Sequence, residues 1–188
     1  MSEKSAKITI GSNSFDLPMI EGTMGYPAMD ARFLNNKGMY SHDPGFTSTA
    51  SCTSGITYVD GDKGELLYRG YPIEQLAEKS DFLDVSYLLF NGNLPNTKEK
   101  QVYSSTINSQ SLLHDQLNNV FRGFRRDAHP MAVMIGVVGS MAAFYFDDMN
   151  INNPNHRRLS ANRLLAKIPT IAAWSHNYNL GLPFVYPT

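Results

Sequence analysis

The longest uncharged apolar stretch of the sequence, Met131 to Phe146, constrains the fold more than any other feature. Gly136 and Gly139 interrupt it, and Asp147 and Asp148 close it. As a helix it would reach about 24 Å, whereas the apolar core of a bilayer is about 30 Å thick. We therefore expect a buried helix here and not a membrane span.

A helix that is apolar on nearly every side must be covered on every side. A chain of 188 residues has few other elements that can do this. The two glycines would let the backbone of another helix approach closely, which favours a contact between subunits through residues 130–146. The core of a monomer is the alternative, and the sequence leaves both open.

Two β-rich segments precede the helical part of the sequence. Residues 7–10 and 15–20 flank the turn GSNS, and Pro18 in the second run suits an edge strand. A clearer hairpin covers residues 56–69, with Asp, Gly and Lys in its turn. The segment 41–55 between them is rich in Ser, Thr and Gly without any period, and is typical of an ordered loop or linker.

From Tyr71 onward the apolar residues follow helical spacing. Pro72 can open a first helix, Asn91-Gly92 can end the second, and Thr97 and Ser111 can cap two more. His129-Pro130 starts the apolar helix, with His129 as an N-cap or turn residue. Asn153-Pro154 starts the last helix, in which Pro169 predicts a kink. Each of these helix starts and ends is thus predicted from a turn or cap residue in the sequence.

Charge and cysteine content exclude several kinds of partner and compartment. Sixteen basic and seventeen acidic residues give a net charge of −1, so no global field would hold a nucleic acid or an anionic membrane. Cys52 is the only cysteine and cannot form an intramolecular disulfide. Residues 1–10 lack the apolar run of a signal peptide. We expect a cytoplasmic protein with neither nucleic acid nor membrane as a partner.

The acidic turn of the hairpin invites comparison with a calcium-binding loop. Asp60, Asp62 and Gly64 fit the first positions. Such a loop needs Gly at its sixth position and Glu at its twelfth, where Glu65 and Tyr71 stand here. A plain hairpin turn is the better interpretation.

Cys52 and the histidines offer little catalytic or metal chemistry. Cys52 could be a nucleophile only beside a base such as His42 or His129, and no local signature indicates this; a buried structural thiol is favoured. The five histidines have no HExxH or CxxC companion, so no metal site is predicted. No Walker loop or GxGxxG motif is present.

The most informative polar group lies in the last predicted helix. Arg157, Arg158, Arg163 and Lys167 gather there, while acidic residues are absent from 150–167. Arg163 and Lys167 are four apart and share a face, so they could hold two phosphate oxygens, the arginine by its fork and the lysine as a point charge. A solvated basic face is the alternative.

Five segments are distinctive: FTSTASC (46–52), ITYVDGDKGELLYRGYPIEQLAEKS (56–80), LLFNGNLP (88–95), FRRDAHPMAVM (124–134) and PTIAAW (169–174). Taken together, they resemble bacterial citrate synthase, in its N-terminal part. The resemblance covers essentially the whole chain in one register. The β layer before Asp43 is similar to the extension of the hexameric, NADH-regulated type II enzymes of Gram-negative bacteria.

The resemblance implies a mainly α fold. A small N-terminal β domain would cover residues 1–45, and the N-terminal part of the large helical citrate synthase domain would cover 46–188, including the hairpin 56–69. It also implies an obligate oligomer, a dimer or hexamer, formed through the helix 130–146 and its neighbours.

The implied activity is that of an acyltransferase of the tricarboxylic acid cycle, which condenses acetyl-CoA with oxaloacetate and water to give citrate and CoA. In the family, histidines and an aspartate act on the two carbonyl compounds and arginines hold the dicarboxylate. All of these lie in the second half of a chain more than twice this long. We therefore expect no catalytic residue, no metal and no bound cofactor here, and no activity from this chain alone.

The resemblance also implies a regulatory site for NADH, as an allosteric inhibitor of the full-length enzyme. Its tyrosine, arginine and lysine correspond to Tyr145, Arg163 and Lys167. Regulated members often have Arg-His-Thr where this chain has Ser109-Gln110-Ser111, so a cation and an aromatic donor that would face the nucleotide are missing.

Other departures lie near Cys52 and at the last residue. Relatives usually have Glu and Lys at Thr53 and Gly55, which indicates drift in a loop, and an arginine at Thr188, which indicates a shortened gene, an incomplete sequence or a frameshift. Two alternatives to an N-terminal enzyme portion stay open. One is a non-catalytic assembly module that pairs with a full-length enzyme, and the other is a nucleotide-binding regulatory module.

Overall fold

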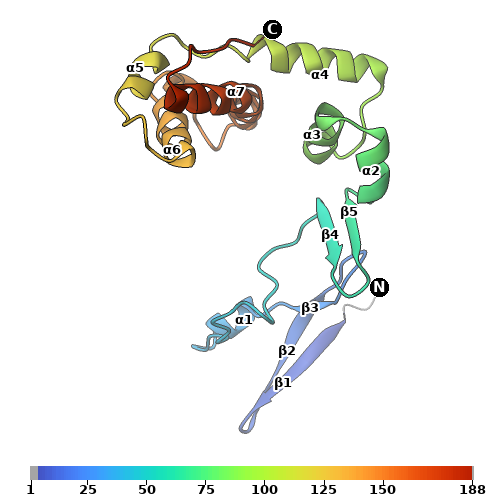
Figure 1. Ribbon diagram of the computed structural model, residues 1–188. Coiled ribbons are helices and arrows are strands. Elements are labelled where there is room, and N and C mark those ends of the chain that lie inside the picture. Colours follow the sequence, from blue (N-terminus) through green and yellow to red (C-terminus); the bar gives the residue numbers. More distant parts are fainter. Residues whose placement is uncertain (1–3, 188) are drawn as a thin grey trace. The chain divides into compact units, whose positions relative to one another are not determined.

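The computed structural model describes residues 4–187. Internal contacts group the chain into two compact units, residues 1–94 and 95–188, which are described one at a time below (Figure 1). The domains predicted from the sequence, 1–45 and 46–188, rest on resemblance to a family and not on contacts, and they stay a prediction.

The N-terminal β layer is a three-stranded antiparallel sheet. Its strands are β1 (Ser5–Ile10), β2 (Asn13–Ile20) and β3 (Ala28–Met29), in that order across the sheet, and the short helix α1 (Arg32–Asn35) follows. β1 and β2 pair from Ser5 opposite Pro18 to Ile10 opposite Asn13. Gly11 makes the tight turn between them at a φ of 61°, which glycine adopts without strain.

The prediction that Pro18 marks an edge strand is wrong, because β2 lies between β1 and β3. Pro18 is accommodated because β3 pairs with β2 only at Met19 and Ile20, just beyond the proline. The Pro18 carbonyl still accepts a hydrogen bond from the Asp30 backbone N–H at 2.8 Å. The reciprocal bond, from residue 18 to the Asp30 carbonyl, is the one that a proline cannot donate, which is why the β2–β3 ladder extends no further than Met19.

The predicted hairpin 56–69 is present and belongs to a second antiparallel sheet. Its strands are β4 (Thr57–Asp60), β5 (Glu65–Tyr68) and β6 (Tyr71–Pro72). In the turn, the Asp60 carboxylate accepts from the Lys63 backbone N–H at 3.1 Å and pairs with its ammonium at 2.9 Å. The carboxylate is thus used inside the turn, as expected of a plain hairpin.

Two helices complete the first unit, α2 (Ile73–Lys79) and α3 (Phe82–Asn91). Asp81 and Asp84 form a reciprocal capping box at the start of α3, which satisfies two backbone N–H groups that the helix cannot. Gly92 ends α3 in the left-handed conformation, as the Asn91-Gly92 pair predicts.

The regular secondary structure described in the second unit is helical. It consists of α4 (Thr97–Ser109), α5 (Leu117–Arg122), α6 (Pro130–Met141), a single 3-10 turn η1 (Phe146–Asp148) and α7 (Pro154–Leu180), which continues through Pro169. The N-cap of α4 is Asn96, which forms a capping box with Glu99, and not Thr97 as predicted; Thr97 is the first residue of the helix. His129 is the N-cap of α6, accepting from the Met131 backbone N–H, which confirms the prediction.

Two predicted helix bounds are wrong. The helix expected to start at Ser111 begins only at Leu117. The reason is that two backbone carbonyls between α4 and α5, those of Gln110 and Leu112, accept hydrogen bonds from the Lys167 side chain of α7. The helix expected over 130–146 ends at Met141. Beyond it, the backbone N–H groups of residues 142–144 bond three residues back, which tightens the chain out of α-helical geometry.

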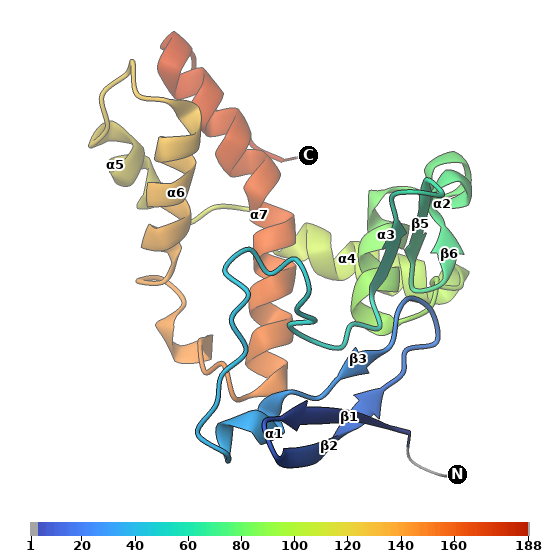
Figure 2. The ribbon, with the colours of Figure 1, turned by 90° about the horizontal axis from the view of Figure 1, so that it is seen from below.

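The core of the second unit lies where α5, α6 and α7 meet, and α6 and α7 run side by side (Figure 2). Trp174, the only tryptophan, is fully buried in it. Phe184, after α7, stacks on the indole with ring centroids 4.3 Å apart, and Phe121 lies 5.6 Å away. The segment that follows α7 therefore closes this core.

Among residues 4–187, no helix is long and apolar enough to cross a membrane.

The two glycines of α6 have different surroundings. A Cβ added at Gly136 would lie 2.5 Å from the ring of Phe124, so the space over this glycine is filled from within the chain and not by another helix. A Cβ added at Gly139 would meet nothing within 4 Å. Only Gly139 is open to a neighbour in the way that the sequence predicts for both.

Gly136→Ala should lower the free energy of unfolding by about 1 to 3 kcal/mol, because the Phe124 ring must leave its place against the core. Gly139→Ala is the matched control, and it should raise stability by up to about 1 kcal/mol, as alanine does in a helix interior. Urea unfolding followed by Trp174 fluorescence measures both. Equal effects of the two substitutions would contradict this packing.

Candidate functional site

The Lys167 side chain is buried, with 3% of the residue exposed. Its ammonium donates to the Gln110 backbone carbonyl at 2.7 Å and to that of Leu112. These bonds tie α7 to the segment between α4 and α5. They explain why α5 starts late, because carbonyls turned toward a lysine are not available to a helix.

Arg163, one turn earlier on α7, shares the Tyr145 ring with Lys167 as a neighbour. Its guanidinium carbon is 4.4 Å from the ring centroid of Tyr145, and the Lys167 ammonium is 5.6 Å from that centroid. Both distances are in the range of a cation–π contact. The structure thus brings together the three residues that the resemblance assigns to an NADH site, and we call Tyr145, Arg163 and Lys167 the cation cluster.

Asp148 contacts the cation cluster and was not predicted from the sequence. Its carboxylate accepts from the Arg163 guanidinium at 2.7 Å, and the Arg163 side chain is only 13% exposed. The absence of acids from 150–167 indicated unpaired cations, but Asp148 stands just before that range. A solvated basic face, the alternative for Arg163 and Lys167, does not describe these buried side chains.

Arg163 keeps two donors that the cluster does not use. Nε and Nη1 are buried and have no hydrogen-bond partner among the residues that the structure describes. A buried N–H without an acceptor costs free energy, and more so on a charged group. An anion with several oxygens could supply what is missing.

Burial lowers the pKa of the Lys167 ammonium below its ordinary value, and the nearby Arg163 charge lowers it further. A negative ligand beside the two cations would act in the opposite direction. The cluster is therefore electrostatically suited to an anion, although Asp148 already neutralises one of its two charges.

Arg157 and the segment 109–111, which departs from the family pattern, add no cationic side chain to the cluster. Arg157 is exposed and donates to the Ile151 carbonyl at 2.6 Å. Ser109 ends α4, and Gln110 and Ser111 follow it, so that this segment reaches the cluster through the Gln110 carbonyl and not through a cationic side chain.

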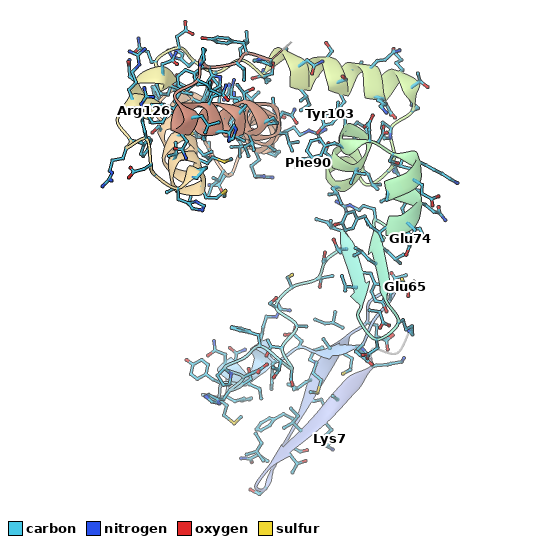
Figure 3. All side chains as sticks on the ribbon, in the orientation of Figure 1. Lys7, Glu65, Glu74, Phe90, Tyr103 and Arg126 are labelled. Atoms are coloured by element: carbon cyan, nitrogen blue, oxygen red, sulfur yellow. The ribbon has the colours of Figure 1, made fainter. Side chains whose placement is uncertain are left out.

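The FRRDAHP segment has structural roles. Arg125 pairs with Asp127 at 2.5 Å, and Arg126, labelled in Figure 3, lies with its guanidinium 5.7 Å from the Tyr178 ring. The Tyr178 hydroxyl donates to the Phe124 carbonyl at 2.7 Å. This segment therefore joins the start of α6 to the end of α7.

Cys52 and the histidines, which the sequence analysis considered as a nucleophile and as metal ligands, form no such site among residues 4–187. The expectation that Cys52 is buried is wrong, because its segment packs against no core and the thiol is exposed. Among residues 4–187 there is no group of three or more His, Cys, Asp or Glu side chains placed to hold a metal ion.

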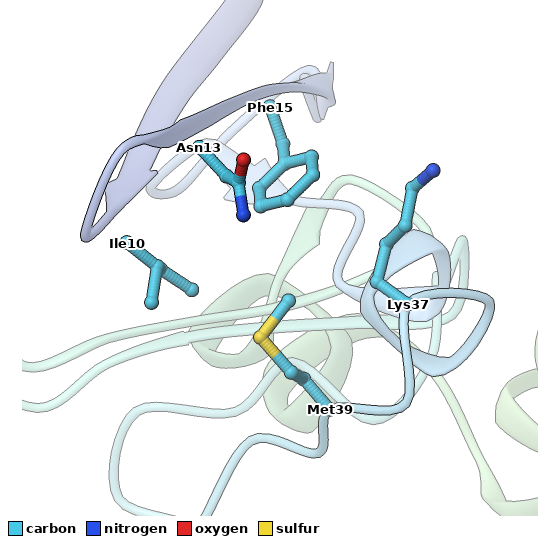
Figure 4. A pocket seen from close by; sticks show the side chains of 5 residues that line it. All are labelled: Ile10, Asn13, Phe15, Lys37 and Met39. Carbon is cyan, nitrogen blue, oxygen red and sulfur yellow. The ribbon is translucent and has the colours of Figure 1, made fainter.

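A shallow pocket lies beside the N-terminal hairpin, and the sequence did not indicate it. The Lys37 ammonium stands 5.8 Å from the Phe15 ring and 5.3 Å from the Phe33 ring. The pocket is lined by Ile10, Asn13, Phe15, Lys37 and Met39 (Figure 4). One exposed ammonium among mostly apolar groups gives no defined binding geometry.

Comparison with known proteins gives a consistent result. The family model described as citrate synthase, C-terminal domain, matches residues 45–188. Among solved structures, the chain is similar to citrate synthase from Thermoplasma acidophilum, in a ternary complex with carboxymethyl coenzyme A and oxaloacetate, at 25% identity and a TM-score of 0.67. It is also similar to the citrate synthases of Thermotoga maritima (28%, 0.65) and Pyrobaculum aerophilum (26%, 0.67).

The matches cover 74%, 77% and 99% of this chain, in that order, but only 36%, 37% and 43% of the other chains. The chain thus spans less than half the length of each structure that it matches. The mainly α fold class predicted from the sequence, a partial helical domain of this type with small antiparallel sheets, is confirmed.

The effect of Lys167→Gln on the pH dependence of stability tests whether burial lowers the pKa of Lys167. Because the pKa of Lys167 is lowered in the folded chain, the unfolded chain binds more protons between that pKa and the ordinary value of 10.5. The free energy of unfolding of the wild type should therefore rise relative to Lys167→Gln as the pH increases from 7 to 10.5. Urea titrations across this range measure the difference.

The exposed Lys98 on α4 provides the control, because Lys98→Gln should leave the dependence on pH unchanged. A wild type that loses stability relative to Lys167→Gln with rising pH would show that the pKa of Lys167 is raised in the folded chain, so that its hydrogen bonds favour the charged form more than burial disfavours it.

Proposed function

Because the chain belongs to the citrate synthase family, we propose that it is a portion of an enzyme that condenses acetyl-CoA with oxaloacetate and water to give citrate and CoA in the tricarboxylic acid cycle. The Thermoplasma relative, solved with carboxymethyl coenzyme A and oxaloacetate, supports this substrate pair. We also propose that the chain supplies framework and no reacting group, and so has no activity alone. It spans only 36–43% of the relatives' length.

Within this enzyme we propose that the cation cluster binds NADH as an allosteric inhibitor, as in the type II enzymes of Gram-negative bacteria. The observation that carries the proposal is the stacking of Arg163 on Tyr145 with Lys167 beside the same ring. The guanidinium fork would take phosphate oxygens, Lys167 would add positive charge, and the Tyr145 ring would hold the guanidinium in place.

The missing Arg-His-Thr at positions 109–111 weakens this site, since Ser109, Gln110 and Ser111 bring no cation. Charge-assisted hydrogen bonds are worth about 1.5 to 3 kcal/mol each. We therefore propose weak NADH binding that depends mainly on Arg163.

An assembly role through α6 is the second candidate function, and one surface feature favours it. Met131 and Ile135 lie four residues apart on α6 and are exposed, Ile135 at 71%. With Gly139, which has open space above it, they form an apolar face with i, i+4 spacing. We propose that a second copy, in a dimer or hexamer, covers this face.

The compartment proposed is the cytoplasm. The supporting observation is that the sequence has a single cysteine, and that its thiol is free and exposed. A reducing environment keeps such a thiol from pairing between molecules.

Arg163→Ala tests the nucleotide site. NADH titrated into the 188-residue chain should bind at least about tenfold more weakly to this variant than to the wild type, because a charge-assisted pair of bonds is removed. Fluorescence of the bound nicotinamide measures the affinity. Arg157→Ala, on the exposed start of the same helix, should bind as the wild type does. Unchanged affinity in Arg163→Ala would remove the assignment.

A further inference from the structure

We propose that Asp148 is an internal competitor for the cation cluster, which keeps the site closed until a ligand with two or more negative charges on phosphate displaces it. The inference rests on the proposed anion site and adds the residue that regulates it. The Asp148 carboxylate is 2.7 Å from the Arg163 guanidinium and takes the position that a phosphate oxygen would take. A carboxylate and a phosphate bind a guanidinium by the same charge-assisted hydrogen bonds.

The closed arrangement is incomplete on the arginine side. Asp148 occupies Nη2 of Arg163, while Nε and Nη1 stay buried without an acceptor in the described part of the chain. Because a short backbone segment holds the Asp148 carboxylate at this distance, the carboxylate binds only one side of the guanidinium. A phosphate group has three terminal oxygens and could bind Nη2 together with Nε or with Nη1, because each of these two nitrogens shares an edge of the planar guanidinium with Nη2.

The acid lies on a segment with few buried side chains, whereas the cations lie on a helix that is anchored in the core. Asp148 ends η1, and the neighbouring Phe146, Met149 and Ile151 are exposed, so few packing contacts hold this segment. Arg163 and Lys167 are on α7, which is anchored in the core by Ile171 and Trp174. Segments with few buried contacts open at low free-energy cost.

Charge determines which ligand can compete. Arg163 and Lys167 carry two positive charges, and Asp148 neutralises one. An intramolecular carboxylate has a high effective concentration, so a free monocarboxylate would not replace it. A phosphate or diphosphate group, with more charge and more acceptors, would gain both the second positive charge and the unused donors. The site therefore selects di- and polyanionic phosphates.

The test compares Asp148→Asn with Asp147→Asn in the full 188-residue chain, with inorganic pyrophosphate as the probe and isothermal titration calorimetry as the measurement. Both substitutions remove one negative charge from η1, but Asp147 is exposed and only Asp148 contacts Arg163. Asp148→Asn should bind pyrophosphate about tenfold more tightly than the wild type. Asp147→Asn should stay within about twofold of the wild type, and Asp148→Ala should reproduce Asp148→Asn.

Three results would overturn the proposal: equal tightening in Asp147→Asn and Asp148→Asn, no pyrophosphate binding by any variant, or tight binding that survives when Arg163→Ala is added to Asp148→Asn. NADH titrations separate this inference from the nucleotide assignment. If NADH binds the wild type and Asp148→Asn equally, the NADH site stands and the competitor role fails. If Asp148→Asn tightens pyrophosphate binding and NADH binds neither, the competitor role stands and the nucleotide assignment fails.

Discussion

The second unit of this chain depends on one buried ammonium group. A buried ammonium has to be hydrogen-bonded. The carbonyls of Gln110 and Leu112 accept from two of its three N–H donors, and the Tyr145 ring centroid lies 5.6 Å from the nitrogen. To present those carbonyls, the chain has to leave helical geometry after Ser109, so α4 ends there and α5 begins only at Leu117. The i, i+4 spacing on α7 places Lys167 beside Arg163, and both cations lie near the Tyr145 ring. The same lysine thus takes part in the connection between α4 and α5 and in the cation cluster.

The halves of α7 have different roles that support each other. The C-terminal half is fixed by Trp174, which is covered by Phe121 and by Phe184 from the segment after the helix. The N-terminal half presents the cations toward a lightly packed segment that contains η1. A rigid pair of cations opposite a movable carboxylate is the arrangement that we propose for a regulated phosphate site, and it needs no reacting group in this chain.

Local patterns predicted much of the fold. The hairpin 56–69, the His129 cap and the Gly92 stop follow from neighbouring residues, whose turn and cap chemistry acts within one turn of the chain. The errors have non-local causes. Pro18 lies in a central strand because a later two-residue strand pairs beyond it. The late start of α5 depends on a lysine more than fifty residues further along the chain.

The candidate site shows the same division. Spacing on one helix and the resemblance to citrate synthase identified Arg163, Lys167 and Tyr145, but nothing local linked Asp148 to Arg163, fifteen residues away across a loop. The most direct test of the overall account is an assay of thiol release from acetyl-CoA by the purified 188-residue chain with oxaloacetate, in a preparation whose Trp174 fluorescence shows a buried indole. The account predicts no release above the rate without protein. Release that depends on oxaloacetate would contradict it, because the reaction centre would then lie within this chain.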